Sequence, residues 1–296
     1  MLASNSYIAR VSEPRVRHIL LSINEGSMTA GMMIGNLING PVIEKLGLDV
    51  MAYTNAGICV LTAAVVAMLV KPIEYEHPVG WREALKPSHL IDTFLCVLKR
   101  RKNHGRLFIQ LIYVIIAVAM FASPAFSSLA FLYLTKDIGI SLISYSVFTS
   151  VDHGSKAVCS TFILLVVKWM GWDLMNTAVM ALAAGVVGYI VMSLTPSMVV
   201  IWIGMIMCSI TIAAFPILRS QLVSLCDADE VGRIYTYDAI LHNVFKNLGS
   251  IFFNFMYGAT VDVWPGMYLA MSAFLTCVSL VVMATFSLLK VKYGSK

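Results

Sequence analysis

Polar side chains recur every four residues within one otherwise apolar segment, 237–258: Asp238, His242, Lys246, Ser250 and Asn254. At about 100° per residue, this spacing places them along one side of a helix. Ionisable groups at bilayer depth are costly, and they usually face a water-filled path or a partner helix. The pattern therefore favours a path for a polar solute or a proton over a passive membrane anchor.

The cation of this ladder, Lys246, lies near the middle of the segment. Its ammonium could hold an anionic group of a substrate, or it could pair with a carboxylate such as Glu25. His242, one turn earlier, is a second candidate for substrate binding or gating. Asp238 lies near one end of the segment, and we expect it to be an interfacial, partly solvated charge.

A second candidate, Glu25, is the one charged residue between His18 and Glu44. Polar residues cluster with it on one side of the predicted helix: Ser22, Thr29, Asn36 and Asn39. A carboxylate in such a low-dielectric setting could take up a proton, which suits proton coupling. The alternative is a structural carboxyl that is hydrogen-bonded to a neighbouring helix.

A third group of ionisable residues consists of Asp152, His153 and Lys156. Asp152 and Lys156 are four residues apart, so they can pair on one helix face, either as a structural pair or as a substrate or proton site. We expect His153 to point elsewhere. It could change its charge near neutral pH or simply hydrogen-bond to a backbone carbonyl.

The elements that must position these residues are membrane-spanning helices. The chain of 296 residues is 59% hydrophobic and only 12% charged, and a span needs about 20 mostly apolar residues. Eight segments qualify, which predicts an all-α, multi-pass membrane protein: Ile19–Gly40, Val50–Val70, Leu107–Leu134, Ser141–Val167, Leu174–Thr195, Ser197–Leu218, Tyr237–Gly258 and Pro265–Leu289.

Enzyme and cofactor chemistry have no support in the sequence. The six cysteines show no CxxC spacing, and the histidines form no HExxH pattern, so we expect no metal, no cofactor and no catalytic centre. The formal charge of +5 does not indicate affinity for nucleic acid, because the basic residues that produce it are distributed over the loops between the predicted spans. The expected partners are the lipid bilayer, protons and a small-molecule substrate.

Orientation follows from the basic residues of the loops, because cytosolic loops are enriched in Lys and Arg. If successive loops alternate sides, one side holds only Lys45 and Lys136. The other side holds both termini and the long polar segment 71–106, so these are predicted to be cytosolic. The run Lys99–Lys102 fits this rule, although an anionic-lipid patch is an alternative.

Small residues four apart, Gly31 and Gly35, have Gly26 and Ala30 nearby in the first predicted span. Such spacing permits close helix packing, and we prefer this interpretation to a phosphate-binding loop.

Two stretches carry a family resemblance. One is Ser6–Ser12 (SYIARVS) with Arg15, Arg17, Glu25 and Gly31 after it; the other is Phe215–Ser224 (FPILRSQLVS) with Asp229–Arg233 (DEVGR) after it. Together they resemble the solute carrier 46 family of the major facilitator superfamily, whose members include a proton-coupled folate transporter. The resemblance implies that Glu25 and His153 serve proton coupling and that Arg219 serves substrate affinity and conformational cycling.

The resemblance also implies the domain organisation. Residues 1–70 match the end of an N-terminal bundle, residues 71–106 a cytosolic central loop, and residues 107–296 a C-terminal six-helix bundle. The chain thus corresponds to the C-terminal eight of twelve helices, and we expect it to be N-terminally incomplete.

The expected function is proton-coupled symport of an organic anion such as folate, in the plasma membrane or an endosomal or lysosomal membrane. A proton-antiport exporter of drugs or metabolites and a non-transporting scaffold or receptor-like protein are the alternatives.

Overall fold

The computed structural model describes residues 4–5, 7–8, 12–13, 15–69, 88–101, 104–194, 197–227 and 230–294. Every long element in this part of the chain is a helix. The helices are α2 (Arg17–Leu46), α3 (Leu48–Leu69), α5 (Ser88–Leu98), α6 (Gly105–Ala122), α7 (Pro124–Leu132), α8 (Leu142–Met170), α9 (Leu174–Leu194), α10 (Met198–Ile210), α11 (Ala214–Ser224), α12 (Val231–Thr260) and α13 (Met267–Gly294).

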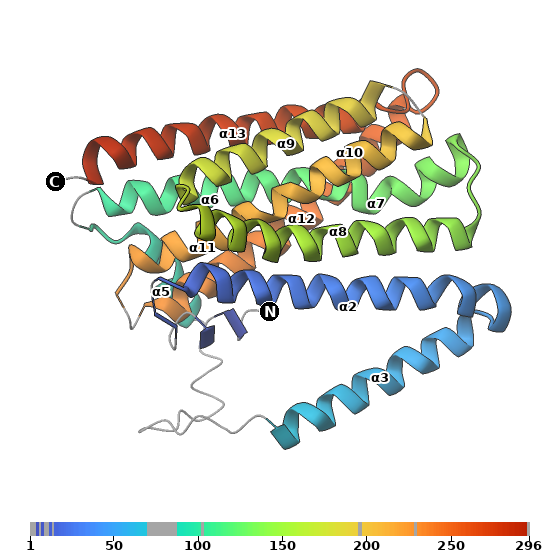
Figure 1. Ribbon diagram of the computed structural model, residues 1–296, viewed down its shortest axis with the longest axis horizontal. Helices are drawn as coiled ribbons and strands as arrows, with labels where there is room; N and C mark the ends of the chain where they lie inside the picture. The colour runs from blue at the N-terminus through green and yellow to red at the C-terminus, as the bar shows by residue number, and fades with distance from the viewer. Residues whose placement is uncertain are drawn as a thin grey trace.

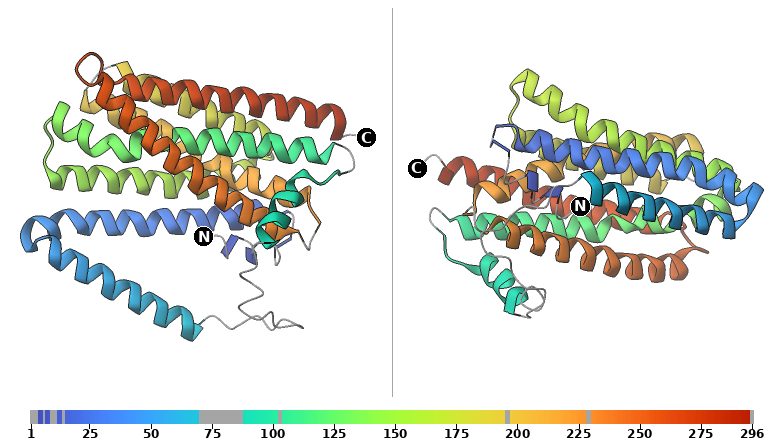
Figure 2. Two further views of the ribbon diagram at one scale, coloured as in Figure 1. Left: turned by 180° about the vertical axis from the view of Figure 1, so that it is seen from behind. Right: turned by 90° about the horizontal axis from the view of Figure 1, so that it is seen from below.

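The helices from α6 to α13 run up and down in one elongated bundle, and α2 lies along α8 at its edge (Figure 1). After a turn at Gly47, α3 diverges from the bundle (Figures 1 and 2). We call the end where α6 begins and α13 finishes the basic end. Successive spans of the bundle therefore run in opposite directions (Figure 1).

Each of the eight predicted segments overlaps one long helix or two consecutive shorter ones. Six spans are long and apolar enough to cross a bilayer: Leu48–Met68, Gly105–Lys136, Leu142–Met170, Leu174–Leu194, Met198–Ser224 and Met267–Lys292. The two remaining long helices, α2 and α12, are those that carry Glu25 and the polar ladder. The chain is thus an integral membrane protein, and Glu25 and the polar ladder lie on the two long helices outside this apolar set.

Two of the spans are broken near their middle. Pro124 begins α7 directly after α6 ends, because a proline has no N–H to continue the helical hydrogen bonds. A single 3₁₀ turn, Thr211–Ala213, separates α10 from α11. The hydroxyl of Thr211 donates to the carbonyl of Ala181 on α9 at 3.3 Å, which fixes this turn against the neighbouring helix.

The contact between α2 and α8, which we call the α2–α8 seam, is made through small residues. A Cβ on Gly26 would collide with Thr161, and one on Gly40 would collide with Ser146. The hydroxyl of Ser22 also donates to the backbone of α8, at the Ser160 carbonyl.

Gly26, one of the predicted set of small residues, takes part in this seam, whereas a Cβ on Gly31 or Gly35 would meet no described atom within 4 Å. They lie on the opposite side of α2, and the spacing of small residues alone did not indicate which pair faces a helix.

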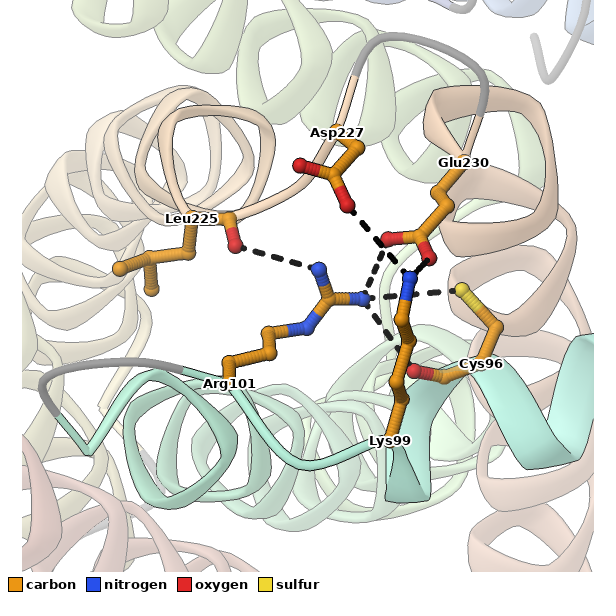
Figure 3. A network of polar contacts seen from close by, with 6 residues as sticks. All are labelled: Cys96, Lys99, Arg101, Leu225, Asp227 and Glu230. Atoms are coloured by element: carbon orange, nitrogen blue, oxygen red, sulfur yellow. Dashed lines mark hydrogen bonds and ion pairs between the residues drawn. The ribbon is translucent and has the colours of Figure 1, made fainter.

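At the basic end, α5 is tied to the start of α12 by a polar network (Figure 3). Glu230 accepts from Lys99 at 2.5 Å and from Arg101 at 2.6 Å, and Lys99 also lies 3.5 Å from Asp227. Burial alone would raise the pKa of Glu230, but hydrogen bonds from the two cations outweigh it and lower that pKa.

Two cations of the basic run thus face carboxylates rather than lipid. Much of the predicted central loop, at 71–87 and 102–103, lies outside the described residues.

Candidate functional site

A cavity of about 260 Å³ opens between α2 and the bundle. Its size is just below the range of about 300–1,000 Å³ that is usual for small-molecule sites. Apolar side chains such as Met120, Phe126 and Met205 form part of its wall. The charged and titratable residues of its lining come from six helices: Glu25, Asp152, His153, Lys156, Tyr189, Cys208, Arg219, His242 and Lys246. All seven candidate site residues of the sequence are therefore brought together in one cavity.

The most buried polar group of the site joins three helices, and we call it the Arg219 cluster (Glu25, Arg219 and Asp238). Arg219, on α11, donates through Nη1 to Oε1 of Glu25 on α2. Its Nε donates to Oδ2 of Asp238 on α12 at 3.0 Å. The three side chains are only 8%, 4% and 5% exposed in the order Glu25, Arg219, Asp238.

The local sequence explains why Arg219 is buried. Helix α11 begins directly after the 3₁₀ turn, and its Ile217, Leu218 and Leu222 all pack into the apolar core. A short helix that is buried on nearly all sides leaves no solvent-facing position for a long side chain. The guanidinium is therefore held where only carboxylates from α2 and α12 can satisfy it.

The charges of the Arg219 cluster do not cancel. One guanidinium faces two carboxylates, so the cluster carries one excess negative charge when both carboxylates are ionised. A buried net charge is expensive unless it is neutralised. Uptake of one proton from the cavity would make the cluster neutral, and Glu25 is the carboxylate of the cluster that lines the cavity.

Asp238 was misjudged from the sequence. It is not an interfacial, solvated charge, since it is 4% exposed and paired with Arg219. The two residues are 19 positions apart and lie on either side of the turn between α11 and α12. Position within a span therefore did not indicate the pairing.

The pair on α8 is confirmed. Lys156 donates to Asp152 at 2.6 Å, one helical turn apart. The expectation that His153 points elsewhere is wrong, because it lines the same cavity. The Nδ1 atoms of His153 and His242 are both buried, and neither has a hydrogen-bond partner among the described residues.

Lys246 also lines the cavity, but it does not pair with Glu25, whose carboxylate is taken by Arg219. No ion pair to Lys246 exists within the described part of the chain, and its side chain is exposed. It is therefore a cation available to a ligand.

The last two residues of the ladder, Ser250 and Asn254, have a structural role. Ser250 contacts Ser128 on α7 at 3.2 Å, and Asn254 donates to the Ser250 carbonyl at 2.7 Å.

Among the described residues, no three His, Cys, Asp or Glu side chains are grouped so that they could hold a metal ion. What the cavity offers instead is an exposed ammonium, two imidazoles, an internally neutral pair and a carboxylate on a charged cluster. Such a set can bind an anion and hold a proton.

Comparison with known proteins agrees with this architecture. Residues 1–246 match the family model of the Major Facilitator Superfamily. The chain is similar to a protein of Drosophila melanogaster named "Probable peptidoglycan muropeptide transporter SLC46", with 22% identity over 96% of this chain and 56% of that protein. The chain thus spans little more than half the length of this relative.

A solved structure shares the fold. The human organic anion transporter MFSD10 (TETRAN) aligns with a TM-score of 0.70 and 14% identity, over 94% of this chain and 66% of that one. The resemblance to the solute carrier 46 family is confirmed by the Drosophila relative. With more than half of its length matched by the family model, the chain belongs to the major facilitator superfamily.

Proposed function

We propose that this protein is a secondary transporter that moves an organic anion together with a proton. The observation that carries the proposal is the Arg219 cluster at the cavity wall, with one cation between two buried carboxylates. Ionisable groups within a membrane protein are retained where they serve a solute or proton path. Midplane sites between helices of this superfamily type hold substrate and coupling ions.

The anion would be held by Lys246, since its ammonium faces the cavity without a protein carboxylate. Lys156 is offset by Asp152 at 2.6 Å, and Arg219 by its own two carboxylates. The most favourable place for a substrate carboxylate is therefore near Lys246, with the His242 ring one turn away on α12. The human protein that shares this fold is an organic anion transporter, which is consistent with this choice, and folate is a suitable probe.

The proton would be taken by Glu25. When the carboxyl is protonated, the Arg219 cluster is neutral, and its burial is less costly. His153 lines the same cavity and would relay protons or share them with the substrate. We place the basic end in the cytosol, because Lys and Arg concentrate there.

The test is uptake of labelled folate by cells that express the protein, measured from acidic to neutral external pH. We expect uptake to rise with acidity and Glu25→Gln to abolish that rise, because a carboxamide cannot be protonated. A Glu25→Gln variant with the wild-type pH profile would refute the role of Glu25.

A second variant tests the anion site. Lys246→Gln should raise the KM for folate at least about tenfold, since a charge-assisted bond contributes about 1.5–3 kcal/mol. Lys246→Arg, which keeps the charge, is its matched control. Acid-driven loss from loaded vesicles would instead indicate antiport, and equal flux in wild-type and mock-transfected cells would favour the scaffold.

A further inference from the structure

Asp238 has no task in the transport scheme above, although it is among the most buried charged groups in the described chain. Its side chain is 5% exposed and accepts one hydrogen bond, from Nε of Arg219 to Oδ2. Its second oxygen, Oδ1, is buried and has no hydrogen-bond partner among the described residues. A buried carboxylate oxygen without a donor is costly, so this vacant acceptor calls for a reason.

The groups around Asp238 come from four helices. Asp238 interacts directly with Tyr113 on α6, Arg219 on α11, and Tyr235 and His242 on α12. Arg17 and Glu25 on α2 interact with its neighbour Tyr235. The Tyr113 hydroxyl is already committed, since it donates to the Ile234 carbonyl at 2.9 Å. Arg17 donates instead to the Ser12 carbonyl at 3.3 Å. Arg219 is the cation in hydrogen-bond contact with Asp238.

The geometry of Arg219 shows what the vacant oxygen could accept. A guanidinium carries five N–H donors in a rigid fork, and it pairs best with a carboxylate through two parallel bonds. At present the fork is divided, with Nη1 on Glu25 and Nε on Asp238. A two-bond pair, in which an Nη group donates to Oδ1 while Nε keeps Oδ2, would use the vacant oxygen.

We propose that Asp238 is a positioning residue that captures Arg219 in a two-bond pair when Glu25 takes up a proton. The inference rests on the proposed function, since Glu25 must be the proton acceptor. A protonated Glu25 no longer competes for the guanidinium as an anion, and Oδ1 of Asp238 is a carboxylate oxygen without a donor among the described residues. Arg219 therefore remains paired and buried throughout the cycle.

The proposal has a consequence for the contact between helices. Within the described residues, Glu25–Arg219 is the one ion pair that joins α2 to another helix, whereas Arg219–Asp238 joins α11 to α12. Transfer of Arg219 to Asp238 thus removes the ionic link of α2 to the bundle without leaving a buried charge unpaired. The proton would release α2, and Asp238 would keep the free-energy cost of that release low.

The experiment is an infrared titration of the purified protein in lipid, in which the protonated-carboxyl band is followed as the pH is lowered. The band of Glu25 is identified by its loss in Glu25→Gln. In Asp238→Asn, the excess negative charge is gone and Glu25 faces an unshared Arg219. We expect the midpoint of the Glu25 band to move to lower pH by at least about one unit.

The control variants are Asp238→Glu, which should restore the wild-type midpoint, and Asp262→Asn, which removes an exposed carboxylate in the turn after α12 and should not move it. A purely structural role for Asp238 would lower the yield of folded protein but leave the midpoint of the surviving protein unchanged.

The outcomes separate the two proposals. If Glu25→Gln removes a band but Asp238→Asn leaves its midpoint in place, the inference fails and the proposed function stands. If the titrating band disappears in Asp238→Asn and survives in Glu25→Gln, the roles are reversed and the inference fails as well. If Glu25→Gln changes no band, the proton-coupled function itself fails.

Discussion

Replacing Arg219 with methionine is the most demanding test of the Arg219 cluster. The change keeps an unbranched side chain but removes the cation between Glu25 and Asp238, whose side chains are 8% and 5% exposed. Two charge-assisted contacts are lost, and two carboxylates are left facing each other in a buried site. Breaking a buried ion pair in this way costs about 3–5 kcal/mol.

The size of the effect can be measured as thermal unfolding of the protein in detergent. At about 2–4 °C for each kcal/mol in a chain of this size class, Arg219→Met should lower the Tm by roughly 6–20 °C. The matched variant adds Glu25→Gln and Asp238→Asn, so that no charge remains. Because most of the cost of the single change comes from buried charges left without a partner, the triple variant should recover most of the lost Tm.

Two results would contradict this reasoning. A single variant as stable as the wild type would mean that the carboxylates are not held by Arg219. A triple variant as unstable as the single one would mean that the loss comes from packing of the arginine stem and not from the unpaired charges.

Two further perturbations test the packing of α12. Glu230→Gln should lower stability at neutral pH, because the depressed pKa of Glu230 contributes stability above its ordinary value of 4.5; the deficit should shrink as the pH falls below that value, which chemical unfolding at several pH values would reveal. Gly249→Ala should lower the free energy of unfolding by about 1–3 kcal/mol, because the added Cβ would overlap the Phe121 carbonyl. Gly258→Ala, on the same helix with no described atom within 4 Å of the added Cβ, should be nearly neutral in the same thermal assay. Equal Tm values for the two variants would refute the packing argument.

The helices themselves were predictable from composition. Long apolar runs predict spans because each backbone polar group must be satisfied within the segment in lipid. Even the break at Pro124 has a visible sequence cause. The predicted ends of the segments were less accurate. Helix α2 continues to Leu46, and helix α12 already begins at Val231. Polar residues extend these helices beyond the apolar stretch that a hydropathy pattern detects.

Pairing across the site was not predictable in the same way. The Asp152–Lys156 pair was found because both partners lie on one helix, four residues apart. Pairs between helices depend on their rotation and depth, which no local pattern encodes. Lys246 was therefore considered as a partner of Glu25, whereas the partner in the structure is Arg219.

Smooth contact along the α2–α8 seam has a mechanical consequence. Where glycines and serines replace large side chains, two helices hold each other through close backbone approach. Few large side chains then have to change rotamer when one helix rotates against the other. The α2–α8 seam would thus allow α2 to rotate against α8 once the ion pair between Glu25 and Arg219 is broken.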